Sequence, residues 1–536
     1  MLVEHLMQML SKIMGSNLNE LLCTSIVFFG VLVLVKIIQW FKLMLRLPPG
    51  PWGFPFFGYL LFLKEETYLQ YIELSKKYGS IFCTYLGKQL VVVISDYQII
   101  RDMFLQREFT GRPHTEFSNI LGTYGIINVD GHLWKEQRKF LLGIFRSFGK
   151  TASHGKKAME TRIKREVKSF LEILLMTRTE PTSPTHLLAT SISNVICSFL
   201  MSVRFEHGEM RFKRFMHLID EGFKLFGTIA HVNFFPIMRY LPRSREVRNK
   251  IIKNIDEMGL FFQETIEEHR RTFDPNVTRD LIDSYLLEIH NAKNEGREAE
   301  LFQGRDHNRQ MQQILGDLFS AGMETVKTTL EWAIIFMLHY PEAARAVQEE
   351  LDMVVGRFRM PSLDDQEFLP ITQATIWEIL RKSSIVPLGT THAATKDVMV
   401  KDYLIPADSQ VVPNIYAVHM NPELWDKPEE FRPSRFLDSE GKPQKPKHFI
   451  PFGIGQRVCL GEKLANYEIF LFFSSLLHIF DIRLPAGASL PNLRSNIGVT
   501  LTPDPYKVCY IRRNFDIIDF NIAPEQNGPL RNVGAV

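Results

Sequence analysis

A cysteine near the C-terminal end of the chain lies in a glycine-framed loop that could hold a metal ion. The loop runs from Phe452 to Gly461, and Cys459 follows Arg457 by two residues. A helix-like run begins directly after the loop, and a thiolate at a helix N-terminus has a lowered pKa and stays ionised. Such a thiolate donates electrons strongly to iron, and the Arg457 guanidinium could meet a carboxylate with two donors. The loop could therefore hold a metal such as iron through its thiolate.

Two other interpretations of this loop can be compared with the metal site. A structural cysteine in a tight turn fits the same residues, because short motifs also arise by accident. A dinucleotide-binding loop does not fit, because Val458 stands in place of the third glycine and the preceding segment is rich in Pro and Lys. Gly455 and Gly461 would let the backbone approach a flat ligand and adopt dihedral angles that other residues resist.

A carboxylate and a hydroxyl are adjacent in the sequence Ala321-Gly-Met-Glu-Thr325. Gly322 weakens a helix at this point, and Thr325 can bond back to a carbonyl one turn earlier, so that a small molecule or water could sit in a local opening. Glu324 and Thr325 could then pass protons. A tolerated glycine beside an ordinary polar pair is the alternative.

Glu378 and Arg381 place opposite charges one helical turn apart on the same face. On a surface helix such a pair contributes little to stability. The segment from 375 to 381 is largely apolar, so we expect this pair to be buried, where each charge needs full compensation.

Trp134 and Arg138 stand four residues apart and would face the same way on a helix. The indole N–H and the guanidinium could both donate to a carboxylate. An amphipathic helix with a buried tryptophan is the alternative.

Together these patterns resemble the cytochrome P-450 family. The cysteine loop matches F-x-x-G-x-R-x-C-x-G, residues 321–325 match the oxygen-activating A/G-G-x-D/E-T helix, and E-x-x-R and W-x-x-x-R are both present. The motifs occur in the family's order from Trp134 to Gly461, and with the N-terminal segments the resemblance covers nearly the whole chain. Ser384 departs from the pattern, because the family commonly has a proline three residues after Arg381. This puts the usual backbone path beside the substrate in doubt.

The resemblance implies roles for individual residues. Cys459 would be the proximal ligand of a heme iron, and Thr325, with Glu324 as its acidic neighbour, would steer protons toward dioxygen. Arg435, in a segment that matches P-x-x-F-x-P-x-R-F, would join Glu378 and Arg381 in a structural lock beneath the heme. The implied cofactor-binding residues are Trp134, Arg138, His392, Phe452, Arg457 and Gly461, with a plain turn histidine as the alternative for His392.

The same resemblance implies the cofactor and the partners. The cofactor would be heme b (iron protoporphyrin IX) with a Cys thiolate axial ligand. Electrons would come from NADPH through NADPH–P-450 reductase, with cytochrome b5 as a second candidate donor, because the chain carries no flavin or nicotinamide motif. The basic residues Lys135, Arg138, Lys139 and Arg146 could steer an acidic partner, although a solvated helix face explains them nearly as well.

Helical and strand patterns must position these motifs, and they indicate a mainly α class with a small β region. The expected elements are helices over 67–78 and 311–339, helical patterns through 140–355, strands over 81–86 and 90–95 joined by residues 87–89, and a β-rich patch over 398–413. The polar stretch 291–309 is expected to be an exposed loop. The class agrees with a cytochrome P-450 fold preceded by one transmembrane helix.

An apolar run from Leu21 toward Leu45 predicts a membrane anchor, because it reaches spanning length once Lys36 snorkels. Positive charges follow the run, so the N-terminus would be lumenal and the bulk cytosolic, at the endoplasmic reticulum membrane. A cleaved signal peptide is the rival, but no small-x-small site follows. The expected parts are a lumenal segment (1–20), the anchor (21–45), a proline-rich hinge (46–55), a heme-thiolate monooxygenase domain (56–513) and a C-terminal tail (514–536).

Composition excludes other classes of protein. The net charge is only +3 and no basic tail is present, which argues against nucleic-acid binding. The five cysteines are scattered and form no C-x-x-C pair, which fits a reducing compartment and offers no zinc or disulfide framework.

The substrate side is expected to be lined by residues 112–128, 315–325, 383–392 and 496–500, whose apolar and small side chains suit a bulky apolar molecule with a few hydroxyls. In finer detail the anchor and the segments around residues 320–325 and 381–388 are similar to those of arthropod family members that hydroxylate moulting steroids at C26 and inactivate these hormones (ecdysteroids). The same scaffold serves fatty acids, juvenile hormone and xenobiotics. Alternatives of another class are a non-redox heme-thiolate isomerase, which the intact Glu324–Thr325 pair disfavours, and a heme or steroid carrier.

Overall fold

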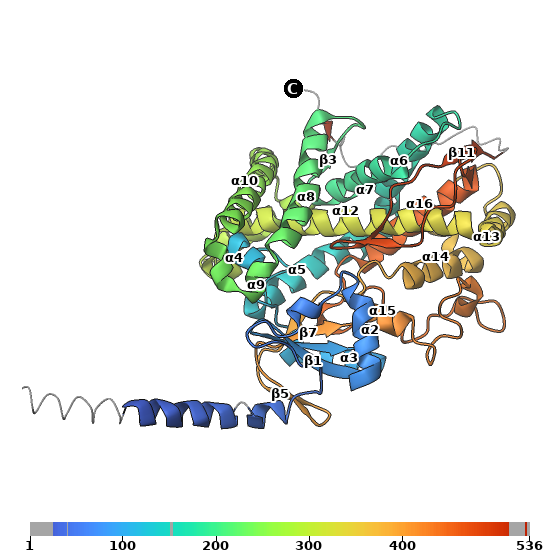
Figure 1. Ribbon diagram of the computed structural model, residues 1–536. Helices are drawn as coiled ribbons and strands as arrows, with labels where there is room; N and C mark the ends of the chain where they lie inside the picture. Colours follow the sequence, from blue (N-terminus) through green and yellow to red (C-terminus); the bar gives the residue numbers. More distant parts are fainter. Residues whose placement is uncertain (1–24, 40, 151–153, 514–530, 533–536) are drawn as a thin grey trace, which may run out of the picture.

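The longest helix of the protein, α12 (His307–His339), passes through the middle of the molecule (Figure 1). The computed structural model describes residues 25–39, 41–150, 154–513 and 531–532. Side chains on all sides of α12 are buried beyond residue 322, because α7 (Pro184–Leu200), α14 (Pro370–Ser383) and α16 (Glu462–Ile479) pack around it. A helix with polar residues at such positions must satisfy them within the protein. The polar side chains buried on α12 are therefore candidates for a functional site.

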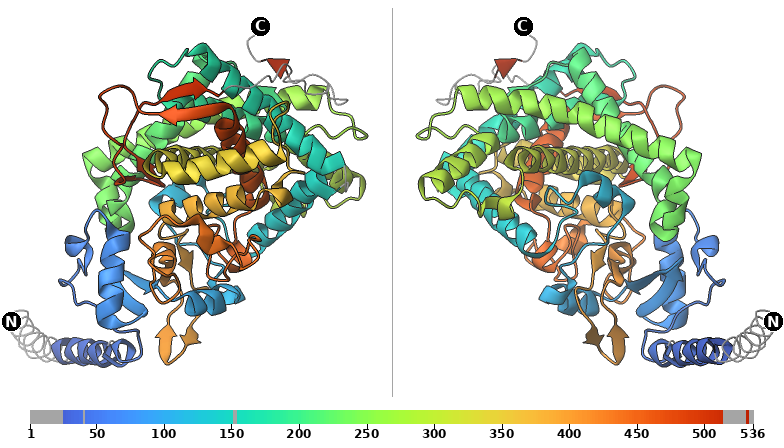
Figure 2. Two further views of the ribbon diagram at one scale, coloured as in Figure 1. Left: turned by 90° about the vertical axis from the view of Figure 1, so that its right-hand side faces the viewer. Right: turned by 90° about the vertical axis from the view of Figure 1, so that its left-hand side faces the viewer.

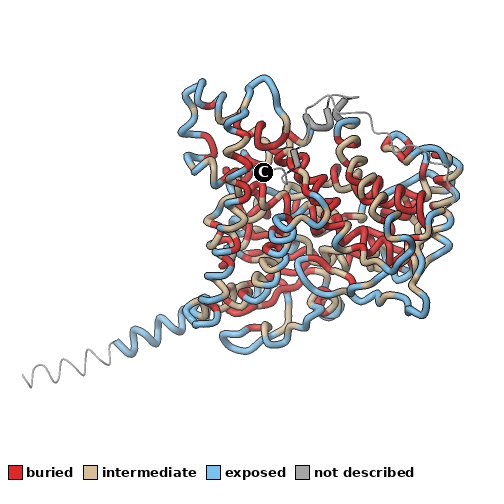
Figure 3. The backbone as a smooth tube through the Cα atoms, turned by 90° about the horizontal axis from the view of Figure 1, so that it is seen from above, coloured by how far each residue is buried: buried red, intermediate tan, exposed pale blue. Residues whose placement is uncertain are grey.

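Other helices surround this center, and the predicted mainly α class is confirmed. They are α2 (Thr67–Tyr78), α3 (Tyr97–Phe104), α4 (Glu116–Leu121), α5 (Gly131–Lys150), α6 (His154–Met176), α8 (Met210–Ile229), α9 (His231–Phe234), α10 (Pro242–Arg271), α11 (Leu281–Asn294), α13 (Pro341–Val354) and α15 (Ile415–His419). Buried residues concentrate in the interior of this assembly (Figure 3).

The small β region consists of one mixed sheet and several two-stranded pieces. The sheet has the order β1 (Ile81–Leu86), β2 (Gln89–Ile94), β7 (Gln410–Pro413) and β4 (His392–Ala393), with β2 and β7 parallel. The pairs are β5 (Val398–Val400) with β6 (Tyr403–Ile405), β8 (Phe480–Arg483) with β11 (Cys509–Arg512), β9 (Ser495–Ile497) with β10 (Leu501–Pro503), and β3 (Val203–Arg204) with β12 (Arg531–Asn532). Figures 1 and 2 place the main sheet and the N-terminal helix on the same side of α12.

An N-terminal helix over Ser25–Met44 is long and apolar enough to cross a membrane, with a mean hydropathy of 2.1 over an 18-residue window. It extends away from the rest of the chain (Figures 1 and 3), and the side chains of residues 25–39, 41 and 42 are exposed. Residues 48–53, within the expected hinge, form no helix or strand. The expected lumenal segment (1–20) and all of the expected tail except 531–532 lie outside the described residues.

Two local expectations differ from the structure. The hairpin between β1 and β2 closes on Gly87 and Lys88 alone, because Gln89 already pairs with Leu86. The stretch 291–309 is not simply an exposed loop: α11 continues to Asn294, and α12 begins at His307. Leu301 and Phe302 between them are buried in the main core. These two apolar side chains anchor a connection whose polar composition had predicted full exposure.

Candidate functional site

The cysteine loop turns tightly against helix α3. Gly455 has φ +84°, and a Cβ there would lie 2.1 Å from the backbone oxygen of Phe104. Glycine is therefore required at this position. Gly461 has an ordinary φ of −94°, and a Cβ there would meet open space. The sequence-based argument for special dihedral angles thus holds for Gly455 and is wrong for Gly461.

Cys459 is fixed by backbone contacts at the end of this loop. Its N–H donates to the carbonyl of Phe452 at 3.0 Å, which closes the turn. Helix α16 begins at Glu462, three residues later. The thiol consequently stands at the N-terminus of a long, mostly buried helix, as the sequence predicts.

The pKa of the Cys459 thiol is raised rather than lowered, contrary to the expectation. Burial is the largest cause, and it outweighs the opposite effects of the Gly461 and Glu462 N–H groups and of the Arg138 charge. Yet the side chain is accessible at its surface. The thiol therefore combines dense surroundings with an accessible sulfur that a ligand could reach. The helix N-terminus alone does not ionise this sulfur, whereas a metal cation bound to it would.

Two guanidinium groups stack on the buried indole of Trp134. The guanidinium carbon of Arg457 lies 3.9 Å from the ring center and that of Arg138 lies 5.9 Å from it. Arg138 also donates to the carbonyl of Val458 at 2.6 Å, which ties α5 to the cysteine loop. Burial, followed by the charge of Arg112, lowers the pKa of Arg457 to about 8. Positive charges buried this close to one another indicate a site that binds anionic groups.

Arg112 is the third cation of the cluster, and sequence reasoning placed it only at the edge of the substrate segments. Its guanidinium donates to the carbonyls of Ile127 at 3.0 Å and Thr391 at 2.7 Å. Burial lowers its pKa to about 10, although Asp130 raises it. The sequence feature that could have identified Arg112 is that it is the one charged residue in the stretch 109–113.

His392 is buried on β4 beside this cluster, as a member of the main sheet rather than of a turn. Its ring stacks on Phe104, with the ring centers 4.0 Å apart and the planes at 6°. Burial, followed by the charges of Arg112 and Arg457, lowers its pKa to about 3, so the ring is neutral. Nδ1 donates to the Phe109 carbonyl at 2.7 Å. Nε2 is then an acceptor, and it could donate to a carboxylate only as an imidazolium.

These residues fit a heme. The Nε1 of Trp134 is buried and has no hydrogen-bond partner within the described part of the chain. It stands among three guanidinium groups that Asp130 compensates only in part. An unpartnered indole N–H and excess positive charge suit the two carboxylates of a porphyrin. The accessible thiol of Cys459 supplies the axial ligand that such a group needs.

The middle of α12 presents the predicted proton-handling pair. Ala321 is exposed and Thr325 is half-buried, although the residues that follow on α12 are buried. The Thr325 hydroxyl donates to the Ala321 carbonyl at 2.8 Å, which is the predicted back-bond. Helix α12 is continuous here, and a Cβ on Gly322 would lie 2.8 Å from Cδ1 of Ile196. Gly322 thus allows α7 to approach α12 closely.

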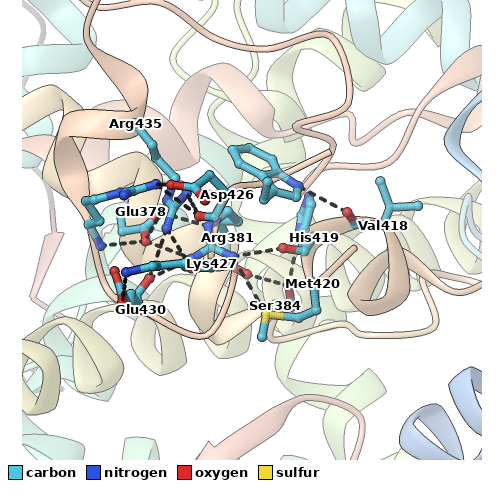
Figure 4. A network of polar contacts seen from close by, with 12 residues as sticks. Glu378, Arg381, Ser384, Val418, His419, Met420, Asp426, Lys427, Glu430 and Arg435 are labelled. Atoms are coloured by element: carbon cyan, nitrogen blue, oxygen red, sulfur yellow. Dashed lines mark hydrogen bonds and ion pairs between the residues drawn. The ribbon is translucent and has the colours of Figure 1, made fainter. Parts of the chain in front are cut away.

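The Glu378–Arg381–Arg435 network forms as the sequence predicts (Figure 4). Arg381 donates one hydrogen bond of 2.7 Å to each carboxylate oxygen of Glu378. Nε of Arg435 donates to Oε1 of Glu378 at 3.1 Å. Neither Glu378 nor Arg381 has any exposed side-chain surface. Arg381 also donates to the carbonyl of His419 at 2.8 Å. The charges are therefore compensated as a buried group requires.

Ser384 has a structural reason to replace the usual proline. It ends α14 with φ +36°, whereas a proline ring fixes φ near −65°. Its hydroxyl donates to the Arg381 carbonyl at 2.7 Å and contacts Nδ1 of His419 at 2.8 Å (Figure 4). Nε2 of His419 accepts from the Ile450 N–H at 3.1 Å, so Nδ1 is the protonated nitrogen and donates to Ser384.

Helix α12 also fixes the segment expected to border the substrate. Oδ2 of Asp317 accepts from the N–H groups of Ile126 at 2.7 Å and Ile127 at 3.0 Å. Gln310 exchanges two hydrogen bonds with the backbone of Gly125, at 3.1 and 3.2 Å. These contacts bring the 112–128 and 315–325 segments together, and sequence reasoning did not single out either side chain.

The basic stretch of α5 is divided between two faces of the helix. Lys135, Lys139 and Arg146 are exposed, whereas Arg138 is half-buried and points to the cysteine loop. Arg138 is therefore not part of a surface that could steer a partner, which corrects the expectation for that residue.

Comparison with known proteins agrees with this geometry. The model of the family "Cytochrome P450" matches residues 48–510. The chain is 51% identical to Cytochrome P450 18a1 of Drosophila melanogaster over 516 residues, which is 95% of both chains. It is 36% identical to mouse Cytochrome P450 2J5 and 35% identical to human Cytochrome P450 2J2, each over 87% of this chain and 91% of the relative.

The class defined by the fold and the site is that of the heme-thiolate oxidoreductases. The chain belongs to the cytochrome P450 family. It is accordingly an enzyme of the monooxygenase type, which uses heme with a cysteine thiolate ligand and electrons supplied by a reductase.

Proposed function

We propose that this protein hydroxylates an ecdysteroid at C26 and thereby inactivates a moulting hormone. The observation that carries the proposal is the 51% identity to the Drosophila Cytochrome P450 18a1 over nearly the whole of both chains. The similarity of the segments 320–325 and 381–388 to arthropod steroid hydroxylases supports the same substrate. The segments expected to line the substrate side suit a bulky apolar molecule with a few hydroxyls.

In this proposal Cys459 is the axial ligand. Arg457, Arg138 and Trp134 bind the heme carboxylates from the α5 side, and Arg112 joins them. His392 lies beside the same cluster, where its neutral ring stacks on Phe104 and borders the heme site. Phe452 and Gly461 bracket the ligand loop, and the network of Glu378, Arg381 and Arg435 holds the surrounding segments in place.

The bound heme supplies dioxygen activation and electron transfer when two electrons reach it. The residues of this chain supply the setting. Thr325 presents a hydroxyl at the accessible part of α12, and the adjacent Glu324 supplies an acid. Apolar side chains packed around α12 exclude water from the helix surface away from Thr325. This exclusion limits the loss of protons and reactive species to solvent.

The electron donor that this proposal requires is NADPH–P-450 reductase, with cytochrome b5 as the second candidate, at the endoplasmic reticulum membrane. The N-terminal helix supports anchoring, and Lys36, Lys42 and Arg46 near its C-terminal end support a cytosolic globule. Lys135, Lys139 and Arg146 on α5 offer an exposed basic surface for an acidic partner. The exposed sequon at Asn276 tests the orientation: it stays unmodified in a cytosolic globule, and a glycan there would contradict the topology.

The substrate is tested with purified full-length protein, reductase, NADPH and a panel of ecdysteroids, fatty acids, juvenile hormone and xenobiotics. We expect 26-hydroxylated ecdysteroid as the main product. A fatty acid, juvenile hormone or xenobiotic as the preferred substrate would contradict the proposal, as would product formation without NADPH, which an isomerase would show.

The ligand is tested with Cys459→Ala, compared with Cys509→Ala as the matched control. The reduced, CO-bound protein should lose its thiolate-type Soret band in the first variant and keep it in the second. A Cys459→Ala variant that keeps this band would remove Cys459 from the ligand role.

A further inference from the structure

The segment 122–127 is attached to the start of helix α12 by several side chains. Arg305, just before the helix, donates through Nη1 to the carbonyl of Thr123 at 2.7 Å and to its hydroxyl at 2.8 Å. The residues that follow in the segment are bound by Gln310 and Asp317 of α12. Hydrogen bonds therefore hold this segment to α12 at most of its positions.

Tyr124, in the middle of the segment, is contacted by two arginines. The guanidinium carbon of Arg309 lies 4.8 Å from the center of the Tyr124 ring, and that of Arg305 lies 5.6 Å from it. Both distances are within the range of cation–π attraction. Arg305 thus contacts the ring of Tyr124 and the backbone of Thr123 at once, so the ring and the two arginines form one clamp.

Thr123 has a backbone conformation that needs this support. Its φ is +60°, in the left-handed region that β-branched residues rarely adopt. Such a conformation persists where surrounding contacts fix it, and it is common at ligand-binding sites. The contacts of Arg305 with Thr123 and with Tyr124 supply that support, and the segment should relax when they are lost.

The same stretch of chain connects α12 with the cation cluster of the heme site. Nη2 of Arg457 donates to the carbonyl of Val129 at 2.7 Å. Asp317, which binds the stretch from α12, lies one helical turn before the exposed Ala321. Residues 122–129 therefore run between the heme-binding arginines and the accessible part of α12, where the substrate is expected.

We propose that Tyr124 is a positioning residue for substrate specificity: clamped by Arg305 and Arg309, it fixes the shape of the segment 122–127 and thereby which carbon of a bulky apolar substrate faces the heme. The inference rests on the proposed function for the choice of substrate. It adds to that function the residues that select the position of hydroxylation. The clamp acts through the backbone of the segment, so the ring and the two charges are required, whereas the tyrosine hydroxyl is not.

Four variants separate these contributions. Tyr124→Leu removes the ring, Tyr124→Phe keeps it, and the double variant Arg305→Gln/Arg309→Gln removes both charges. Lys77→Gln is the matched control, because Nζ of Lys77 lies 5.1 Å from the ring center of Tyr78 on α2, outside the expected substrate segments. The Soret band of the reduced, CO-bound protein counts the folded holoenzyme in each variant.

The measured quantities are KM, kcat and the ratio of hydroxylated products, with reductase, NADPH and the ecdysteroid. In Tyr124→Leu and in the double arginine variant we expect KM to rise by about fivefold while kcat stays within about twofold of the wild type, and a second hydroxylated position to appear. Tyr124→Phe and Lys77→Gln should match the wild type.

Three results would overturn the proposal. The first is a wild-type KM and product ratio in Tyr124→Leu. The second is the same change in Tyr124→Phe as in Tyr124→Leu, and the third is a change in Tyr124→Leu that the double arginine variant lacks. Either of the last two would assign the effect to direct contact of the tyrosine with the substrate.

Hydrogen exchange tests the clamp without turnover. The amides of residues 125–127 should exchange about fivefold faster in Tyr124→Leu than in the wild type, and Lys77→Gln should leave them unchanged. Unchanged exchange in Tyr124→Leu would show that no clamp exists. A wild type that prefers another class of substrate would refute the proposed function, whereas the product ratio with that substrate and the exchange rates would still decide the role of Tyr124.

Discussion

Arg381 and Glu378 are joined by two hydrogen bonds of 2.7 Å while neither side chain has any exposed surface. Such a pair adds little to stability relative to an apolar pair, but removal of one partner strands a buried charge. Arg435 reaches the same carboxylate, and Arg381 also donates to the His419 carbonyl. The network therefore joins α14 to the segments around residues 419 and 435.

Arg381→Ala should lower the free energy of unfolding by about 3–5 kcal/mol, because Glu378 is left buried without its bidentate partner. Urea unfolding of the holoprotein, followed by circular dichroism, measures the change. Arg432→Ala is the control: its ion pair with Asp426 lies at the surface and should change stability by about 1 kcal/mol or less. Equal midpoints for Arg381→Ala and the wild type would contradict the role of the network.

Asp317→Ala should destabilise the segment at residues 125–127 by about 1–3 kcal/mol for each backbone N–H that loses its acceptor. Ile126 and Ile127 both donate to this carboxylate. Hydrogen exchange at these two amides should accelerate, whereas the amides of the β1–β2 hairpin should be unaffected. Unchanged protection at Ile126 and Ile127 would show that another group holds the segment.

The Asp317 carboxyl makes the stability of the protein depend on pH. Burial raises the pKa of its carboxyl, although the two amides and Gln313 oppose the rise. The native state thus keeps the proton to a higher pH than the unfolded chain does. The free energy of unfolding therefore falls as the pH rises from about 4 to the raised pKa of Asp317. Asp317→Asn should remove that slope in urea midpoints measured across this window.

Much of the site follows from charge and spacing in the sequence. Trp134 with Arg138 and Glu378 with Arg381 were predictable because residues one turn apart share a helix face. The role of Arg112 was not predictable, because its position beside Arg457 depends on how residues 109–112 pack against β4. The raised pKa of Cys459 was not predictable either: the nearby helix N-terminus can be read from sequence, but the burial that outweighs it comes from tertiary packing.

His269 and Asp280 form a buried pair between the end of α10 and the start of α11, with Nε2 of His269 2.8 Å from Oδ2 of Asp280. Nδ1 of His269 contacts the Thr265 carbonyl at 2.8 Å, so both ring nitrogens carry protons. Burial lowers the pKa of His269, but the hydrogen bond to Asp280 and the negative charge of Asp280 raise it by more. The pKa of His269 is therefore raised overall.

This pair should stabilise the protein fully below pH of about 6.5 and progressively less as the pH rises through the raised pKa of His269. Thermal unfolding of the wild type should therefore show a falling midpoint above that pH. His269→Gln should be less stable at low pH and should lack this component of the slope. A wild-type slope that survives in His269→Gln would assign the effect to other groups.

Thr325→Ala should separate NADPH consumption from hydroxylation. The Thr325 hydroxyl lies at the accessible part of α12 and bonds only back to the Ala321 carbonyl in the described contacts, so its loss should leave the helix intact. If it steers protons, the fraction of NADPH recovered as product should fall by about tenfold or more, with peroxide formed instead. Thr329→Val is the matched control, because its hydroxyl makes the same back-bond, at 2.9 Å, from a buried position one turn later. Thr325→Ser should restore coupling, since it keeps the hydroxyl. Coupling that stays at the wild-type level in Thr325→Ala would remove Thr325 from proton supply, while the binding of heme by Cys459 would be untouched.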